Sequence, residues 1–131
     1  MRGLWGVAGL AVAAAIGIRC NDSSNPVGSN IVFPPTDVSF GAHVQPLFNE
    51  TCAFTGCHGE NEPAAGLRLT SYDGLMFNSL QVVIMGKPDE SILVLRIEGR
   101  LGSRMPLNRP ALTQNQINGI RTWIAEGALN N

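Results

Sequence analysis

The segment CAFTGCHG, residues 52–59, constrains what this 131-residue chain can fold into more than any other. It holds two of the three cysteines and one of the two histidines in the sequence. The rest of the chain offers few large side chains for a core, with two Trp, one Tyr and five Phe against 15 Gly. A domain of roughly a hundred residues buries a limited core, and a covalent staple or a large apolar cofactor would stabilise it. We therefore expect the fold to be organised around Cys52, Cys57 and His58.

The residues alone leave three interpretations of this cluster open. Cys52 and Cys57 could form a structural disulfide if the protein is exported. They could bind zinc together with His58 and His43, although neighbouring side chains rarely aim at one tetrahedral ion. They could also attach haem covalently, because a histidine directly after the second cysteine can reach the iron. The haem interpretation gives each of the three clustered residues a distinct role.

The spacing of the cysteines differs from the usual haem-attachment motif, which has two residues between them, whereas this chain has four. The haem vinyl groups are fixed in position, so the two additional residues must bulge outward. Gly56, next to the second cysteine, could take the required backbone turn. A second iron ligand is expected from Met105, which precedes a proline in a predicted loop, because a thioether suits haem iron and raises its reduction potential. His43 is the alternative second ligand.

The first nineteen residues are predicted to be an export signal. Arg2 is followed by an uncharged run over residues 3–18, which is typical of a secretory signal peptide and shorter than the roughly 20 residues of a spanning helix. An uncleaved membrane anchor is the alternative. Cys20 follows directly and resembles the lipidated cysteine of bacterial lipoproteins, although Arg19 stands where that class has a small residue. Cleavage further upstream would instead leave Cys20 as a free thiol or a dimer bridge.

The remainder divides into a tether and one domain. Residues 20–38 are rich in Ser, Asn, Gly and Pro, which predicts a flexible tether. Residues 39–131 are predicted to form the folded domain. The net charge of the whole chain is −1, and no run of Lys or Arg is present, so nucleic-acid binding is not expected.

Apolar periodicity and capping residues predict an all-α domain. The first helix should begin after Ser39, with its regular turns delayed by Pro46. Shorter helices are expected from Ser71 and from Pro88 to Gly99, and a longer one from Thr113 to Gly127 with a capping box. Residues 81–85 could be a short strand, but nothing pairs with it. The long loops 56–70 and 99–112 are expected to wrap a bound group.

Five blocks occur in order: FGAHVQPLF with the CHG motif, AGLRLTSYDGL, VIMGKPDESILVLRI, RMP and LTQNQINGIRTWIAEGA. Together they resemble the planctomycete-type cytochrome c domain of the class I cytochromes c over residues 40–128. The resemblance implies a small cytochrome c-like fold of three to five short helices, with long loops wrapped round one covalently bound haem c. It also implies that Cys52 and Cys57 are the thioether attachment sites, His58 the proximal iron ligand and Met105 the distal one. The departures are the four-residue spacing and a single proline after the methionine, where the family often has two.

The resemblance implies a monohaem electron-transfer protein rather than an enzyme. We expect it to be exported to the periplasm or cell surface, tethered to the membrane through lipidated Cys20, monomeric, and docked transiently to redox partner proteins. Arg96, Arg100, Arg104 and Arg109 could pair with a haem propionate or steer an acidic partner. The alternatives are a haem-based ligand sensor, a redox subunit of a larger oxidoreductase, and a haem-free interaction module with a disulfide.

Overall fold

The computed structural model describes residues 29–131. The predictions of an export signal and of a lipidated Cys20 lie outside the described residues. The elements, in chain order, are η1 (Phe40–Val44), α1 (Gln45–Thr51), η2 (Ala64–Gly66), α2 (Tyr72–Met76), η3 (Pro88–Glu90), α3 (Ile92–Ile97) and α4 (Gln114–Ala125). This described part contains no strand, so the prediction of a small all-α fold with long loops is confirmed. None of its helices is long and apolar enough to cross a membrane.

The first helical segment begins where the sequence predicts. The Ser39 side chain accepts a hydrogen bond from the Ala42 N–H at 3.1 Å and caps the helix. The first turn, η1, is wound as a π-helix, and regular α-helical turns start at Gln45 with Pro46 in the first turn. Proline has no N–H to donate into the preceding turn, which explains the delayed start. The apolar face of η1 and α1 is buried at Phe40, Val44, Leu47 and Phe48.

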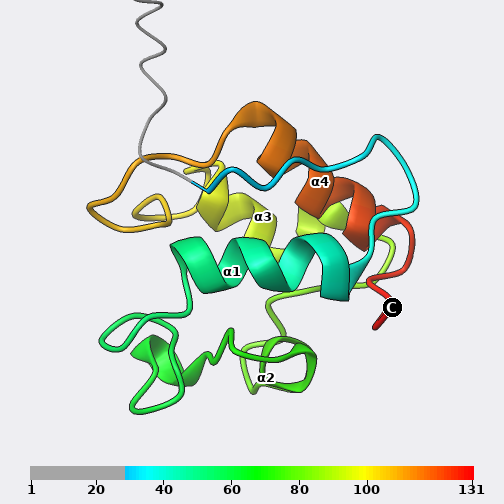
Figure 1. Ribbon diagram of the computed structural model, residues 1–131. Helices are drawn as coiled ribbons and strands as arrows, with labels where there is room; N and C mark the ends of the chain where they lie inside the picture. Colours follow the sequence, from blue (N-terminus) through cyan, green and yellow to red (C-terminus); the bar gives the residue numbers. More distant parts are fainter. Residues whose placement is uncertain (1–28) are drawn as a thin grey trace, which may run out of the picture.

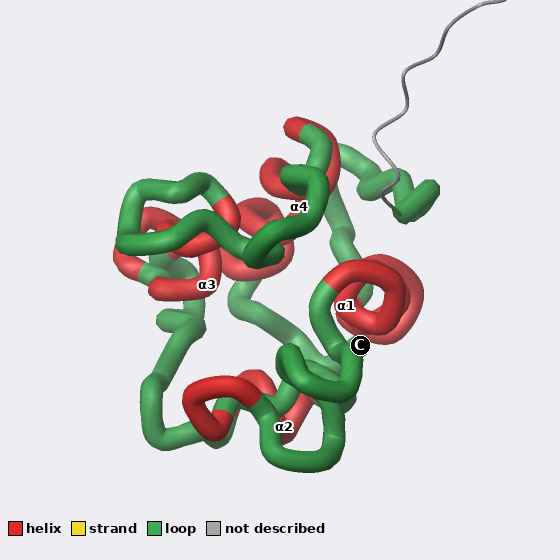
Figure 2. Tube along the Cα trace, turned by 90° about the vertical axis from the view of Figure 1, so that its left-hand side faces the viewer, coloured by secondary structure: helices red, strands yellow, loops and turns green. Residues whose placement is uncertain are grey.

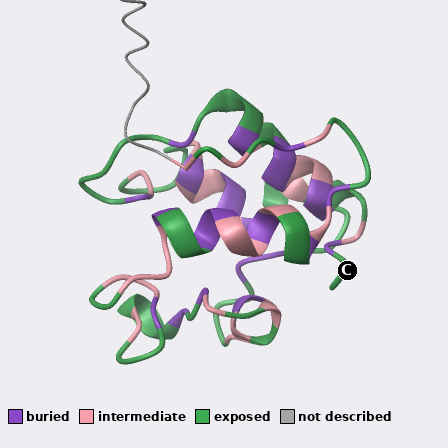
Figure 3. Cartoon of the chain, in the orientation of Figure 1, coloured by how far each residue is buried: buried purple, intermediate pink, exposed green. Residues whose placement is uncertain are grey.

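Helix α4 is the longest helix, and its capping box is formed as expected. The Thr113 N–H donates to the Gln116 side chain at 2.9 Å, while the Gln116 N–H donates back to the Thr113 hydroxyl. Gly127 follows the helix with φ of +106°, a conformation that favours glycine. The buried face of α4 packs with α3, and both lie at the opposite end of the molecule from α2 (Figures 1 and 2). Buried residues lie along the inward faces of α1, α3 and α4 (Figure 3).

The helix predicted from Pro88 to Gly99 is interrupted at Ser91 and becomes η3 and α3. Ser91 is fully buried, and its hydroxyl donates to the Lys87 carbonyl and accepts from the Ile84 N–H, each at 2.9 Å. These hydrogen bonds hold the preceding loop against the start of α3. Hydrophobic periodicity along the chain does not predict this contact. Gly99 ends α3 with φ of +70°.

The tether predicted for residues 20–38 is wrong over residues 31–38, which form part of the folded domain. Phe33 and Val38 are 3% and 2% exposed and belong to the core. The segment runs along α4 in Figure 1, coloured blue to cyan. Its polar composition hid these apolar side chains, whose partners lie far along the chain: the Phe33 ring lies against Gly119, and the Phe33 N–H donates to Asn115, 82 positions away. We call residues 29–38 the strap.

Side chains of α4 hold the strap through its backbone. Asn115 accepts from the Phe33 N–H at 2.8 Å and donates to the Phe33 carbonyl at 3.0 Å. The Gln116 amide donates to the carbonyls of Ser29 and Ile31 at 2.8 and 3.2 Å. Near the other end of α4, the Glu126 carboxylate accepts from two successive strap N–H groups. Several backbone polar groups of a segment without secondary structure are thereby paired.

Candidate functional site

One cavity of about 240 Å³ is lined by all four residues that the sequence selects as haem-binding: Cys52, Cys57, His58 and Met105. It lies between residues 52–69, which we call the proximal loop, residues 99–112, which we call the distal loop, and one face of α3. The remaining lining is mostly apolar and includes Leu67, Leu69, Leu80, Val82, Ile92, Leu93, Ile97, Pro106 and Leu107.

The four-residue spacing between the cysteines is folded into a compact turn. The Phe54 carbonyl accepts the N–H groups of Cys57 and Gly59, both at 3.0 Å, and the His58 N–H donates to the Cys52 carbonyl at 3.2 Å. A Cβ at Gly59 would lie 2.7 Å from the Phe54 oxygen, so only glycine fits there. Gly56 takes the left-handed backbone turn suggested for it, with φ of +81°.

Cys52 and Cys57 are free thiols, each partly buried. The Thr51 hydroxyl donates its hydrogen to the Leu47 carbonyl at 2.6 Å, so it can only accept from the Cys52 sulfur 3.1 Å away. Burial raises the pKa of the Cys52 thiol above its ordinary value. This cysteine is therefore held as a protonated thiol with a fixed side-chain orientation at the cavity wall.

His58 is oriented by a backbone carbonyl. Its Nδ1 lies 2.9 Å from the Leu67 oxygen, which is an acceptor only, so the ring carries its proton on Nδ1. The Nε2 lone pair is left free for a metal. This arrangement is the usual way in which a second contact fixes the tautomer of a ligating histidine.

Met105 lies in the distal loop, and its backbone is anchored to α3. The Met105 N–H donates to the Arg96 carbonyl at 2.9 Å. The residue is half-buried, belongs to the cavity wall and is not a member of the hydrophobic core. Sequence reasoning selected Met105 because it precedes a proline in a loop between two predicted helices, and the structure places it in the cavity wall.

His43, the alternative ligand, does not line the cavity. Its Nδ1 accepts the Ser39 N–H at 3.1 Å, and its ring lies 5.8 Å from the Phe33 ring, centroid to centroid. The zinc interpretation needs this histidine beside the cysteine motif. Within residues 29–131 no three His, Cys, Asp or Glu side chains come together as a metal-binding group.

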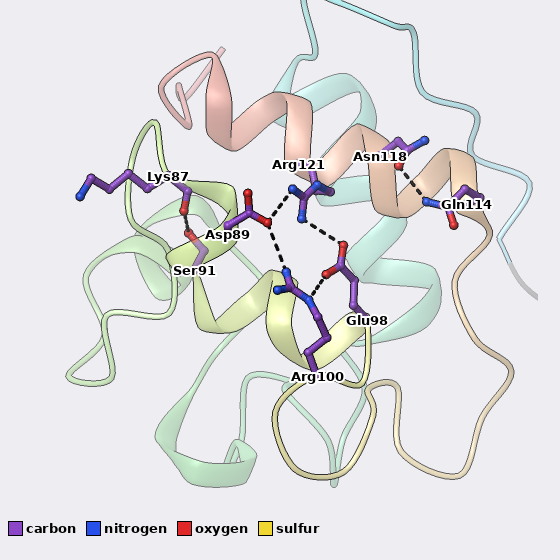
Figure 4. Close-up of polar contacts among 8 residues, drawn as sticks. All are labelled: Lys87, Asp89, Ser91, Glu98, Arg100, Gln114, Asn118 and Arg121. Atoms are coloured by element: carbon purple, nitrogen blue, oxygen red, sulfur yellow. Dashed lines mark hydrogen bonds and ion pairs between the residues drawn. The ribbon is translucent and has the colours of Figure 1, made fainter.

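The four arginines noted in the sequence have different surroundings. Arg96 and Arg109 line the cavity. Arg100 instead forms ion pairs with Asp89 and Glu98, as Figure 4 shows. Arg104 donates through Nη2 to the Arg109 carbonyl at 3.1 Å. Only the first two are therefore placed to meet a charged group of a molecule bound in the cavity.

The apolar wall of the cavity was not identified from the sequence. Leu67 and Leu69 alternate with exposed Arg68, and both leucines face the cavity. That alternation was the available signal, but two residues are too few to distinguish a wall from an ordinary turn. Leu80, 44% exposed, and Leu107, 53% exposed, lie at the cavity rim.

Comparison with protein-family models gives a match to planctomycete cytochrome C over residues 55–106. The matched stretch includes Cys57, His58 and Met105 and begins three residues after Cys52. Neither the curated proteins nor the solved structures gave a match. With the helical fold and the lined cavity, this match supports a cytochrome c-like domain in the chain.

Proposed function

We propose that this protein is a monohaem c-type cytochrome that transfers electrons and does not act as an enzyme. The observation that carries the proposal is the convergence of two thiols, one imidazole and one thioether on a single, mostly apolar cavity. Cys52 and Cys57 would hold haem c through thioether bonds, with His58 and Met105 as the axial ligands. Bound haem iron supplies a one-electron couple between its ferric and ferrous states.

The residues present fit such a group. The Leu67 carbonyl fixes the His58 ring with Nε2 available for ligation, and the backbone bond to α3 holds Met105 in the wall. The apolar lining excludes water and so favours the less charged ferrous state, as does methionine ligation. If His58 and Met105 both hold the iron, the protein would leave no coordination position for a substrate.

Arg96 is the proposed partner of a haem carboxylate. Its only side-chain hydrogen bond within the described residues is a long one, 3.4 Å from Nη1 to the Ser103 carbonyl. Arg100 is paired with carboxylates of the protein, and Arg109 lies over an aromatic ring. An arginine that faces an apolar cavity with little else to bind is suited to a carboxylate.

We propose further that the protein is exported and membrane-tethered through lipidated Cys20, working in the periplasm or at the cell surface as a monomer. A redox partner would dock over the rim formed by Leu80 and Leu107, transiently and over a small area. If Arg96 and Arg109 steer an acidic partner, the rate of electron transfer should fall as ionic strength rises. An electron-transfer rate that does not change with ionic strength would exclude electrostatic steering by these arginines. It would not exclude docking at the rim formed by Leu80 and Leu107.

The test is a visible spectrum of the exported protein, oxidised and reduced, with Met105→Ala beside the wild type. We expect a sharp reduced α-band, haem that stays attached after denaturation, and a weak long-wavelength methionine–iron band that Met105→Ala abolishes. Met85→Ala is the matched control, because Met85 is 55% exposed and outside the cavity. Rapid carbon monoxide binding to the reduced wild type would indicate a ligand sensor. A protein without a haem spectrum would favour the interpretation in which Cys52 and Cys57 form a disulfide.

A further inference from the structure

A cation–π contact joins the two loops that carry the proposed haem ligands. The guanidinium carbon of Arg109, in the distal loop, lies 4.4 Å from the centroid of the Phe54 ring, in the proximal loop. This distance is well within the range of about 6 Å over which such contacts are attractive. Phe54 is one of the four residues that separate Cys52 from Cys57.

Each partner is fixed by its own loop. The Phe54 carbonyl accepts two backbone N–H groups of the cysteine turn. The Arg109 carbonyl accepts from the Arg104 side chain at 3.1 Å, and Arg104 directly precedes Met105. The contact therefore connects the turn that holds the two thiols to the backbone beside the proposed distal ligand.

Nothing else of a polar kind holds the two loops together. Between residues 52–69 and residues 99–112 the structure has no hydrogen bond and no ion pair. Met105 is anchored to α3 through its own N–H, but that bond does not restrain the part of the distal loop that follows it. The Phe54–Arg109 contact is the one directional interaction across the mouth between the loops.

We propose that Phe54 and Arg109 form a clasp, a pair of positioning residues that keeps the distal loop closed over the cavity and Met105 in place as a ligand. The inference rests on the proposed function for its second half, the ligation by Met105. It also gives the longer spacing of the cysteine motif a role, because Phe54, one of the four residues between the cysteines, carries the ring that Arg109 covers.

The experiment uses the full-length ferric holoprotein and measures the rate at which added imidazole displaces the methionine, followed by loss of the methionine–iron band. Phe54→Leu and Arg109→Gln should each raise this rate about fivefold, the opening expected from loss of about 1 kcal/mol. The double variant should be no faster than the single ones, because each already removes the contact. Arg109→Lys should recover part of the effect, since a lysine is also cationic.

Phe77→Leu is the matched control, since Phe77 is 75% exposed and contacts Tyr72 rather than the distal loop. It should leave the displacement rate unchanged. Effects of Phe54→Leu and Arg109→Gln that simply multiply in the double variant would overturn the clasp, as would rates equal to wild type.

A second readout separates the clasp from the proposed ligation. The rate of tryptic cleavage after Arg104, measured by mass spectrometry on the same variants, reports opening of the distal loop whatever ligates the iron. If wild type lacks a methionine–iron band, the ligand assignment fails, and faster cleavage in Phe54→Leu and Arg109→Gln still supports the clasp. Cleavage at the wild-type rate in both variants overturns it.

Discussion

The part of the molecule around α4 and the part around the cavity differ in how their apolar side chains are packed. Around α4, Ile120, Trp123 and Ile124 are at most 1% exposed and pack against other protein side chains. Arg121 links η3 and α3 to α4 by ion pairs with Asp89 and Glu98, part of the four-residue network in Figure 4. Around the cavity, apolar side chains from two loops and α3 line a space instead of filling it.

The difference shows which part of the domain presents apolar surface to a bound group. Protein interiors are close-packed, and apolar surface that faces a space is not stabilised by contacts. The buried apolar side chains of the α4 end pack against one another, whereas those of the cavity wall face a space that a bound group would fill. The comparison therefore predicts that matched changes at the two ends will have different consequences.

The largest effect is expected from truncating one buried isoleucine at each end of the holoprotein. Ile124→Ala, in the packed end, and Ile97→Ala, in the cavity wall, should each lower the free energy of unfolding by about 2–5 kcal/mol. Only Ile97→Ala should also lower the reduction potential, because water admitted to the wall favours the more charged ferric state. Denaturant titration and redox titration measure the two quantities. Equal shifts of the reduction potential in Ile124→Ala and Ile97→Ala would contradict the proposed difference between the two ends.

A smaller effect is expected where the strap crosses α4. A Cβ on Gly119 would lie 2.1 Å from two ring carbons of Phe33, so Gly119→Ala must displace a core residue. We expect a loss of about 1–3 kcal/mol of unfolding free energy with an unchanged haem spectrum. Asn118→Ala, on the exposed face next to it, is the control and should change stability by less than about 0.5 kcal/mol. A spectral change in Gly119→Ala would show that the two ends are coupled.

The smallest effect is expected from Arg121→Gln, which opens the ion-pair network. The half-buried pair with Glu98 should contribute about 1 kcal/mol or less near neutral pH. Lys87→Gln, which removes an exposed pair with Glu90, is the matched control.

The same variant should alter the acid limb of stability. The Arg121 guanidinium, 2.8 Å from the carboxylate, holds the pKa of Asp89 below its ordinary value. A carboxyl whose pKa is lower in the folded state stabilises the fold at pH above its unfolded pKa of about 3.9, and loses that contribution as pH falls through the folded pKa. The wild-type advantage over Arg121→Gln should therefore shrink as the pH is lowered below about 4, as followed by urea unfolding. An advantage that stays constant to pH 2 would assign the effect of Arg121 to packing alone.

Sequence reasoning succeeded where the determinants are local. The predicted caps Ser39 and Thr113 each accept the expected backbone N–H, and the helix expected from Ser71 begins there. Pro46 and Gly99 mark the helix start and the helix end as expected. These signals depend on a few neighbouring residues, so they survive without knowledge of the tertiary fold.

It failed where the partner lies far along the chain. Phe33 is buried by α4, and Ser91 interrupts a helix because it bonds to the loop before it. The clasp between Phe54 and Arg109 likewise joins two loops. Composition and periodicity describe one segment at a time and carry no signal for such contacts. The proposed haem ligands could be selected because residue chemistry, rather than position in a fold, identified them.

The strap also determines where the domain takes a load. A pull applied at Ser29 is carried first by the Gln116 amide, which bonds the Ser29 and Ile31 carbonyls, and next by the paired bonds between Asn115 and Phe33. Asn115 and Gln116 stand in the first turn of α4, the longest helix. Tension that enters along the strap is thus delivered to the first turn of α4, which directly follows the distal loop that carries Met105. A pull on the strap would therefore act at the base of the loop whose geometry the iron would depend on.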